Sequence, residues 1–110
     1  MIIDHRTYTV HPHKFGEFLK IYEELGFEVQ KKHLGNLVGW YTSMDIGELH
    51  QVVHLWAYES LQDRVDRRVN LAADPDWPLY LKEALPCLQK MENKILSPAP
   101  FYKPDFTLKA

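Results

Sequence analysis

Five side chains with chemically useful groups fall on two stretches of the sequence that are typical of β-strands. Alternate positions carry an arginine and a tyrosine on the first stretch, and a histidine, a tryptophan and a tyrosine on the second: Arg6, Tyr8, His54, Trp56 and Tyr58. Residues two apart on a strand share one face, so each set projects to a single side of its strand. If both strands turn these side chains the same way, the five groups converge on one pocket.

This combination of groups suits a small anionic or carbonyl-bearing organic molecule. The arginine supplies positive charge, the tyrosines supply hydroxyl groups and the tryptophan supplies an apolar platform, so these four are the candidate ligand-binding residues. His54 is the candidate catalytic residue, because an imidazole can carry a proton near neutral pH. The alternative is a structural role, in which Arg6 pairs with Asp4 or Glu92 and the aromatic rings are plain core packing.

Metal chemistry is not expected, although the chain has six histidines. His50 and His54 are four residues apart on a strand, hence about 13 Å apart, which is too far to share one ion. His11 and His13 lie at a strand-to-helix corner without an acid or a cysteine beside them. A haem would need an axial ligand facing an open cavity, for which His54 or His33 are the candidates. We therefore expect neither a metal site nor a tightly bound cofactor.

Nucleic acid and membrane are not expected as partners. The 110 residues carry a formal net charge of −2, so no overall basic field attracts polyanions. Three arginines lie close together in a predicted helix, Arg64, Arg67 and Arg68, but Asp63 and Asp66 accompany them. A solvated helical face of mixed charge is the expectation there. No run of about 18 apolar residues is present, so no segment is expected to cross a membrane.

The sequence favours a reducing compartment, and the cytoplasm is the expected location. Cys87 is the single cysteine, so no internal disulfide can form. The first six residues show neither an apolar stretch nor an arginine-rich amphipathic leader, and no targeting peptide is expected. Cys87 lies on an apolar stripe, which favours a buried, inert thiol over a nucleophile.

Four segments favour β-strands because they are rich in β-branched and aromatic residues or are bounded by turn residues. They span residues 1–10, 37–44, 51–58 and 91–96. His11-Pro12 ends the first segment, since the residue before a proline is pushed out of the helical region. A short turn at residues 45–48, containing Gly47, joins the second segment to the third.

Two regions between the strands favour helices. Residues 13–33 repeat apolar side chains at three- and four-residue spacing, which predicts one amphipathic helix. Ser60 is expected to cap the next helix, with Asp63 at capping-box spacing. The inward face of that helix is expected to carry Leu61, Val65, Val69 and Ala72. Asp74-Pro75 opens a further helical piece, which Pro86 is expected to end or kink.

The element order is therefore β-α-β-β-α-β, which predicts an α+β fold of the ferredoxin-like, split βαβ type. Its four-stranded antiparallel sheet places the first and third strands side by side at the centre. The predicted domain covers residues 1–98. The remainder, residues 99–110, is expected to be an extended, proline-rich tail.

A homodimer is expected because neither face of the third strand looks solvated. One face carries Gln51, Val53, Leu55 and Ala57, and the other carries Val52, His54, Trp56 and Tyr58. Helices can cover only one of these faces, and a large exposed apolar patch is uncommon on a monomer. Two sheets packed across a two-fold axis remove that patch. The tail, with Phe101, Tyr102 and Phe106, is either an arm on the partner or a frayed end.

The chain resembles the NIPSNAP family in a set of short motifs spread over residues 1–98. The motifs are Arg6-Thr7-Tyr8, Leu34-Gly35, Val38-Gly39-Trp40, the run from Val52 to Tyr58, Asp63-Arg64 with Arg67-Arg68, Asp74-Pro75 with Trp77, and Glu92-Asn93 with Ile95. Each motif alone is weak, and the set is fairly specific. Asp4 stands where a glutamate is expected in this family, a shorter acid that alters any pairing with Arg6.

The resemblance implies a dimeric α+β barrel, in agreement with the strand argument, and implies little about chemistry. Related barrels include cofactor-free monooxygenases, isomerases, dehydratases and haem proteins, and several hold a pocket between helices and sheet. Such an analogy of fold does not establish a reaction. The expectation is a NIPSNAP-like homodimer that binds or converts a small organic molecule in each subunit, and whether it is an enzyme stays open. The alternative is a non-enzymatic scaffold or protein-interaction module.

Overall fold

The computed structural model describes residues 1–109, in which four strands form one antiparallel sheet. The strands are β1 (Ile2–Val10), β2 (Asn36–Thr42), β3 (Gln51–Tyr58) and β4 (Leu88–Leu96). Their order across the sheet is β2-β3-β1-β4, so the predicted central pair of the first and third strands is confirmed. The fourth strand begins three residues earlier than predicted, because Leu88 already pairs with Val10 beyond an irregularity in the β1–β4 register.

The first helical region is longer and less regular than the single helix expected over residues 13–33. It consists of a 3₁₀ turn (η1, Pro12–Lys14), α1 (Phe15–Ile21), a π-helical turn (η2, Tyr22–Gly26) and α2 (Phe27–Leu34). The helix ends at Gly35, which has a φ of 82°, a conformation open to glycine without strain. A π turn inserts one extra residue and shifts the faces of the helix on either side of it.

The second helical region also divides into two helices, as predicted. α3 spans Leu61–Ala73, α4 spans Asp76–Ala84, and a 3₁₀ turn (η3, Leu85–Cys87) carries Pro86. The Ser60 hydroxyl accepts a hydrogen bond of 3.0 Å from the Asp63 backbone N–H, which confirms the cap. The Asp63 carboxylate in turn accepts from the backbone N–H of Glu59, one residue before the cap.

The predicted inward face of α3 is wrong. Leu61, Val65 and Val69 are exposed, with Leu61 and Val69 each 60 % accessible, and Leu71 is the one α3 residue that is buried. Arg64, which was expected in solvent, faces the sheet instead and reaches the buried Asp4 on β1, whereas Arg67 binds Asp63 on its own helix. Arg64, Arg67, Arg68 and Leu71 also repeat at helical spacing. This second stripe faces the sheet, and the apolar stripe faces solvent, because the buried Asp4 requires a cationic partner.

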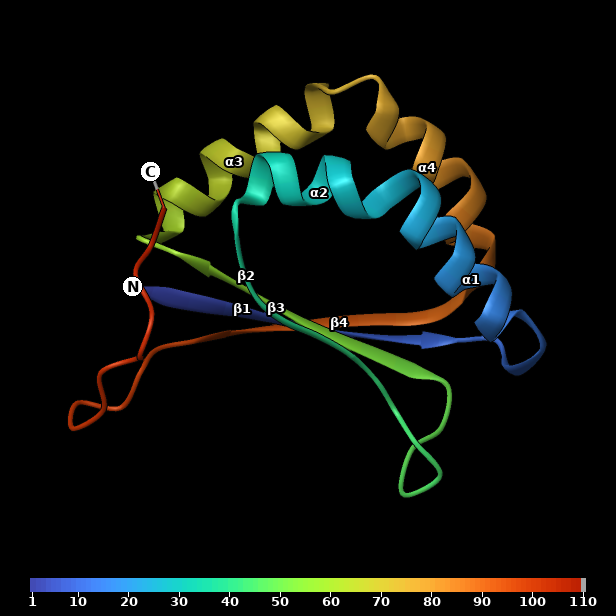
Figure 1. Cartoon of the computed structure of the whole chain (residues 1–110), viewed down its shortest axis with the longest axis horizontal. Coiled ribbons are helices and arrows are strands. Elements are labelled where there is room, and N and C mark those ends of the chain that lie inside the picture. Colours follow the sequence, from blue (N-terminus) through green and yellow to red (C-terminus); the bar gives the residue numbers. More distant parts are fainter. Residues whose placement is uncertain (110) are drawn as a thin grey trace.

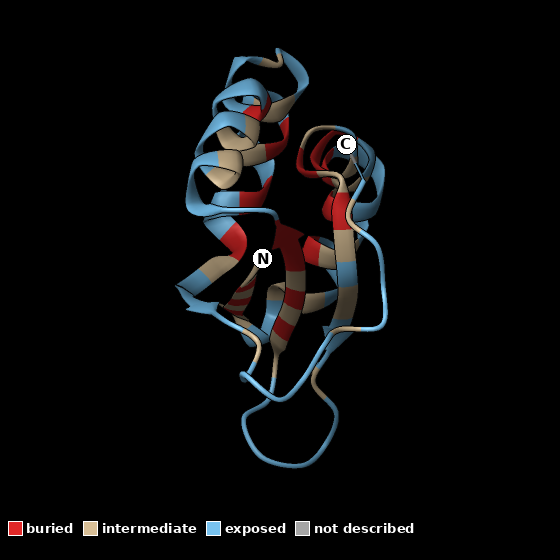
Figure 2. Ribbon diagram, turned by 90° about the vertical axis from the view of Figure 1, so that its left-hand side faces the viewer, coloured by how far each residue is buried: buried red, intermediate tan, exposed pale blue. Residues whose placement is uncertain are grey.

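All four helices described in residues 1–109 cover the same side of the sheet (Figure 1). Buried residues are concentrated between the helices and the sheet, whereas the hairpin loop between β2 and β3 is exposed (Figure 2). The core consists of one cluster around Tyr8, Phe18, Tyr22 and Tyr80 and a second around Leu34, Trp56, Tyr58 and Leu71. The opposite side of the sheet has no helix over it in the described residues (Figure 1).

Gly26 at the end of the π turn lies directly against the ring of Tyr80. A Cβ atom at this position would approach two ring carbons of Tyr80 to 2.7 Å, and Tyr80 is only 4 % accessible, so the ring has little room to move. This contact sets the distance between the first helical region and α4.

We expect Gly26→Ala to destabilise the protein by about 1–3 kcal/mol, because the added methyl group overpacks the contact with Tyr80. The matched control is Gly16→Ala in α1, where a Cβ atom would meet nothing within 4 Å. That control should be neutral or stabilising by up to about 1 kcal/mol. Urea denaturation of both variants measures the difference, and equal stabilities would refute the contact's importance.

Candidate functional site

The five residues singled out from the sequence all lie on the helix-covered side of the sheet. Arg6 on β1 is the direct partner of His54 on β3, and Tyr8 is the partner of Val52. Partners in an antiparallel pair point to the same side, so the two sets share one side of the sheet. All five side chains are buried, and the rings of Tyr8 and His54 lie 5.0 Å apart, edge to face.

A buried carboxylate organises the polar part of this layer. Asp4 is fully buried and accepts hydrogen bonds from Arg6 Nη1 at 3.1 Å, from Arg64 Nε at 2.9 Å and from Asn93 Nδ2 at 3.3 Å. Burial alone would raise the pKa of Asp4, but the hydrogen bond from Arg64 and the charges of both arginines outweigh it and hold this pKa below its usual range. Asp4 is therefore ionised at neutral pH.

Arg6 is fixed by two partners at once. Its Nη1 atom binds Asp4, and its Nε atom donates to the Tyr8 hydroxyl at 2.9 Å. The structural pairing of Arg6 with Asp4 that the sequence left open is thus present, and the alternative partner Glu92 lies opposite Thr7 on the other side of the sheet. Pairing does not remove Arg6 from the site, because its side chain still lines a cavity.

That cavity has a volume of about 130 Å³ and lies between the sheet and the helices α3 and α4. Its polar lining comes from Arg6, Tyr8, Gln30 and Arg68. Its apolar lining comes from Trp77, Tyr80, Leu81, Ala84, Leu85, Leu88 and Met91. The rings of Trp77 and Tyr80 lie 4.8 Å apart and form one wall. A small pocket with apolar walls and a few convergent polar groups is the usual form of a small-molecule site.

His54, Trp56 and Tyr58 lie outside the lining of this cavity and form the layer beside it. Trp56 Nε1 donates to His54 Nδ1 at 2.7 Å, which assigns the imidazole hydrogen to Nε2. Burial, followed by the charge of Arg6, lowers the pKa of His54 to about 3. The imidazole is therefore neutral at pH 7, and this pKa does not support the role as a proton carrier near neutral pH that the sequence suggested for His54.

Several polar atoms in and beside the cavity are buried without a hydrogen-bond partner among residues 1–109. They are Arg68 Nη1, Tyr58 Oη and His54 Nε2; Trp40 Nε1 is also unpaired but lies against Tyr22, away from the lining of the cavity. Burial raises the pKa of Tyr58 to about 12, so its hydroxyl is protonated. All four atoms are able to donate a hydrogen bond, and an unpaired buried donor is costly.

Sequence reasoning missed the helical contribution to the site. The sequence pattern predicts a solvated face for Arg68 and indicates no role in the site for Gln30 or Tyr80. The spacing of Arg64, Arg68 and Leu71 was a usable signal for Arg68. Gln30 had no such signal, since its position depends on the π turn, where Tyr22 donates a hydrogen bond to its side-chain oxygen.

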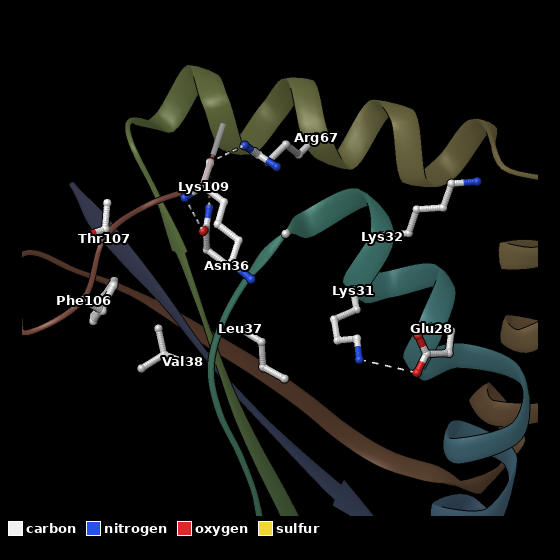
Figure 3. Close-up of a pocket in the computed structure, with 11 residues that line it drawn as sticks. Glu28, Lys31, Lys32, Asn36, Leu37, Val38, Arg67, Phe106, Thr107 and Lys109 are labelled. Atoms are coloured by element: carbon white, nitrogen blue, oxygen red, sulfur yellow. Dashed lines mark hydrogen bonds and ion pairs between the residues drawn. The ribbon is translucent and has the colours of Figure 1, made fainter.

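A second, wider groove of about 740 Å³ lies between α2, β2 and the C-terminal tail (Figure 3). Lysine and arginine side chains border it, but several have partners: Lys31 pairs with Glu28 at 3.4 Å, and Arg67 donates to Asp63 and to the Lys109 carbonyl. Asn36 holds the tail through the backbone of Lys109. The tail thus lies against its own subunit here, and the groove is a less specific site than the smaller cavity at Arg6 and Arg68.

Other classes of site receive no support from the geometry of the described chain. Within residues 1–109, no three histidine, cysteine or acidic side chains come together in a way that would hold a metal ion. Cys87 is buried, as expected, and burial raises the pKa of its thiol. Among the described residues, none of the helices is both long enough and apolar enough to cross a membrane.

The buried neutral state of His54 predicts a specific pH dependence of stability. Its pKa is lower in the native state than the usual 6.5, so its contribution is complete above pH 6.5 and is lost as the pH falls toward about 3. Below pH 6.5, the wild type should lose roughly 1.4 kcal/mol per pH unit more than His54→Gln, which keeps an acceptor for Trp56. Denaturation between pH 7 and 4 measures both slopes. Equal slopes would show that His54 is accessible to protons.

Comparison with known proteins places this geometry in a family. The family model for NIPSNAP matches residues 3–103. A curated human relative, Protein NipSnap homolog 3A, is 30 % identical over 99 residues, which cover 89 % of this chain and 39 % of that protein. A Putative NipSnap protein of Caenorhabditis elegans is 27 % identical over 91 % of this chain and 18 % of its own length. The chain therefore spans well under half of these curated relatives.

Comparison with solved structures identifies the same fold. An uncharacterised NIPSNAP-like domain protein from Burkholderia xenovorans has a TM-score of 0.88 and 42 % identity, covering 99 % of this chain and 94 % of that one. A protein of unknown function from Agrobacterium tumefaciens has a TM-score of 0.86 and 42 % identity over 93 % and 91 % of the two chains. An antibiotic biosynthesis monooxygenase, 11 % identical over 91 % and 100 % with a TM-score of 0.64, shares the ferredoxin-like α+β fold alone. The chain belongs to the NIPSNAP family.

Proposed function

We propose that this NIPSNAP protein works as a homodimer in which each subunit binds a small organic molecule in the cavity between β1 and the helices α3 and α4. The observation that carries the proposal is the lining of that cavity, where two arginines and a tyrosine meet a wall of aromatic and aliphatic side chains. A region needed only for packing would be filled by apolar side chains. The cytoplasm is the proposed compartment, and the buried single thiol of Cys87 is compatible with it.

The size of the cavity limits the ligand to a small molecule. Its volume of about 130 Å³ is close to the roughly 150 Å³ of a cavity that accommodates benzene. Its described lining contains no imidazole, carboxylate or thiol, the groups that most often transfer protons. Binding and orientation of a ligand are therefore better supported than acid–base conversion of it.

The open side of the sheet supports the proposed dimer. Val53, Leu55 and Ile3 share this side, and Tyr41 at its edge is 60 % accessible. The β4 edge differs, since Lys90 and Glu92 form a surface ion pair of 3.0 Å there. The apolar surface on this side is thus concentrated on β3 and the Tyr41 edge, beside the polar residues His5 and Thr7 of β1, and two copies related by a two-fold axis would meet there.

Two projecting segments flank the same side of the sheet and support the same arrangement. The hairpin loop between β2 and β3 and the first part of the tail both extend on the side away from the helices (Figure 1). Each exposes a large apolar side chain: Ile46 is 92 % accessible and Phe101 is 93 % accessible. Single exposed apolar side chains are common on monomers, so these two support the dimer because both flank the open side of the sheet.

We expect Leu55→Lys to convert the dimer into a monomer at micromolar concentration, because it places a charge in the proposed sheet-to-sheet contact. The control is Val65→Lys. Val65 is also an exposed apolar residue, but it lies on the outer face of α3, on the helix-covered side of the sheet and away from the proposed contact. Light scattering should show half the wild-type mass for the first variant and the full mass for the second. A monomeric wild type, or dissociation by the control alone, would contradict this interface.

Ligand binding is tested by thermal shift over a panel of small aromatic acids, aldehydes and quinones. A ligand present at 100 times its Kd stabilises the native state by about 2.7 kcal/mol. The variant Ala84→Leu fills the cavity from its lining, so it should keep or raise the stability while abolishing the response. Ala72→Leu, on the exposed side of α3, should leave the response unchanged. No response in the wild type, or an undiminished response in Ala84→Leu, would refute the proposal.

The alternative of a protein-interaction module is favoured by one specific observation. Leu61, Val65 and Val69 form an exposed apolar stripe on α3, on the face that the arginines leave free. If the panel gives no response and Val65→Lys changes the oligomeric state, this stripe becomes the functional surface in place of the cavity.

A further inference from the structure

We infer that the molecule bound in this cavity is a small carboxylate, and that the guanidinium group of Arg68 is its anchor. The inference deepens the proposed function and rests on it, because it names the chemical class of the ligand and a binding residue that the sequence did not identify. Arg68 lines the cavity from α3, opposite Arg6 and Tyr8 on β1.

The balance of charge around the cavity leaves positive charge without a counter-ion. Three guanidinium groups lie in this region, from Arg6, Arg64 and Arg68, against the single carboxylate of Asp4. Asp4 already accepts from Arg6, Arg64 and Asn93, and no acidic side chain belongs to the described lining. An anion of one negative charge would offset part of this excess.

Arg68 itself is the one of these arginines without a hydrogen-bond partner for a buried nitrogen. Its Nη1 atom is inaccessible and unpaired within residues 1–109, whereas Arg6 and Arg64 both bind Asp4. Burial, and then the charge of Arg6, lowers the pKa of Arg68, although a guanidinium stays protonated at neutral pH. Arg68 as a whole is half-buried, but an inaccessible nitrogen of a charged group without a partner is costly, so binding of an anion is the physical explanation for keeping it.

The neighbouring unpaired groups point to the same type of ligand atom. Tyr58 Oη and His54 Nε2 are buried without partners in the described chain, and both carry a hydrogen that they can donate. Burial is the main influence on the pKa of both groups, raising that of Tyr58 and lowering that of His54, and the charge of Arg68 acts on each as a smaller influence, which places both within its electrostatic reach. A region rich in donors and poor in acceptors selects an oxygen anion over a cation or an amine.

The rest of the lining selects the kind of anion. Trp77, Tyr80 and Leu81 form apolar walls, and the volume of about 130 Å³ leaves room for little more than a small ring or a short chain. A phosphate carries up to two charges and three acceptor oxygens, which these walls would leave largely unpaired. A carboxylate on a short hydrocarbon body satisfies both the guanidinium and the walls.

The test compares probes of matched size and shape, in which a neutral amide with N–H donors replaces the charged carboxylate: benzoate with benzamide, and propionate with propionamide. Binding to the full-length wild-type protein is measured by calorimetry at neutral pH and low salt. We expect the carboxylate of at least one pair to bind at least tenfold more tightly than its amide, on the order of the gain from hydrogen bonds to a charged group.

Two variants assign the effect to Arg68. Arg68→Met removes the charge and keeps an apolar side chain of similar length, and we expect it to weaken carboxylate binding at least about tenfold while its melting temperature stays equal or rises. Arg67→Met is the control on the same helix: Arg67 pairs with Asp63 and the tail, so carboxylate binding should be unchanged. A merely structural Arg68 would give the opposite result, a lowered melting temperature with undiminished binding.

The outcomes separate this inference from the function on which it rests. Equal binding of carboxylate and amide, or tight carboxylate binding by Arg68→Met, overturns the assignment of Arg68 while a small-molecule function stands. The assignment of Arg68 is also overturned if the wild type binds none of the four probes but responds to neutral aldehydes or quinones. Silence from every compound overturns both the inference and the proposed function.

Discussion

The arrangement of the cavity depends on the buried carboxylate of Asp4. A charge that is removed from water without partners destabilises a fold by roughly 3–5 kcal/mol, so Asp4 must be paired. Arg64 reaches it from α3 and Arg6 reaches it along β1, at 2.9 Å and 3.1 Å. These contacts fix the rotation of α3 about its axis. They turn the arginine stripe toward the sheet, which places Arg68 at the cavity and leaves Leu61, Val65 and Val69 in solvent.

The sheet could be predicted from the sequence because its signals are local. β-branched and aromatic runs marked the strands, Pro12 marked the end of β1, and the element order limited the topology to an arrangement that the structure has. The orientation of α3 could not be predicted from its own residues, because two stripes of helical spacing compete on it. The choice between them is made by Asp4, which lies 60 residues away from Arg64 in the sequence.

The candidate site was predicted in part, for a related reason. Alternation along β1 and β3 correctly placed Arg6, Tyr8, His54, Trp56 and Tyr58 on one side of the sheet. Whether a side chain on that side lines a cavity or lies in the layer beside it depends on the helices above. The π turn shifts the face of the first helical region, so that Gln30 lines the cavity, and the contact of Gly26 with Tyr80 brings α4 close. The spacing of apolar residues in the sequence does not by itself reveal an extra residue in a helical turn.

The chemistry of the buried layer separates the residues that stabilise the fold from those that favour a ligand. Asp4, Arg6 and Arg64 satisfy one another, and Trp56 Nε1 donates to a His54 that stays neutral, so these groups account for one another's burial. Arg68 Nη1 has no hydrogen-bond partner within the described chain that would explain its position. The fold nevertheless keeps this arginine beside apolar walls, where a methionine or leucine would pack well. Natural folds tolerate such local costs mainly where binding recovers them. The cost of leaving this one inaccessible nitrogen of Arg68 unpaired is therefore itself an argument that the cavity binds an anion.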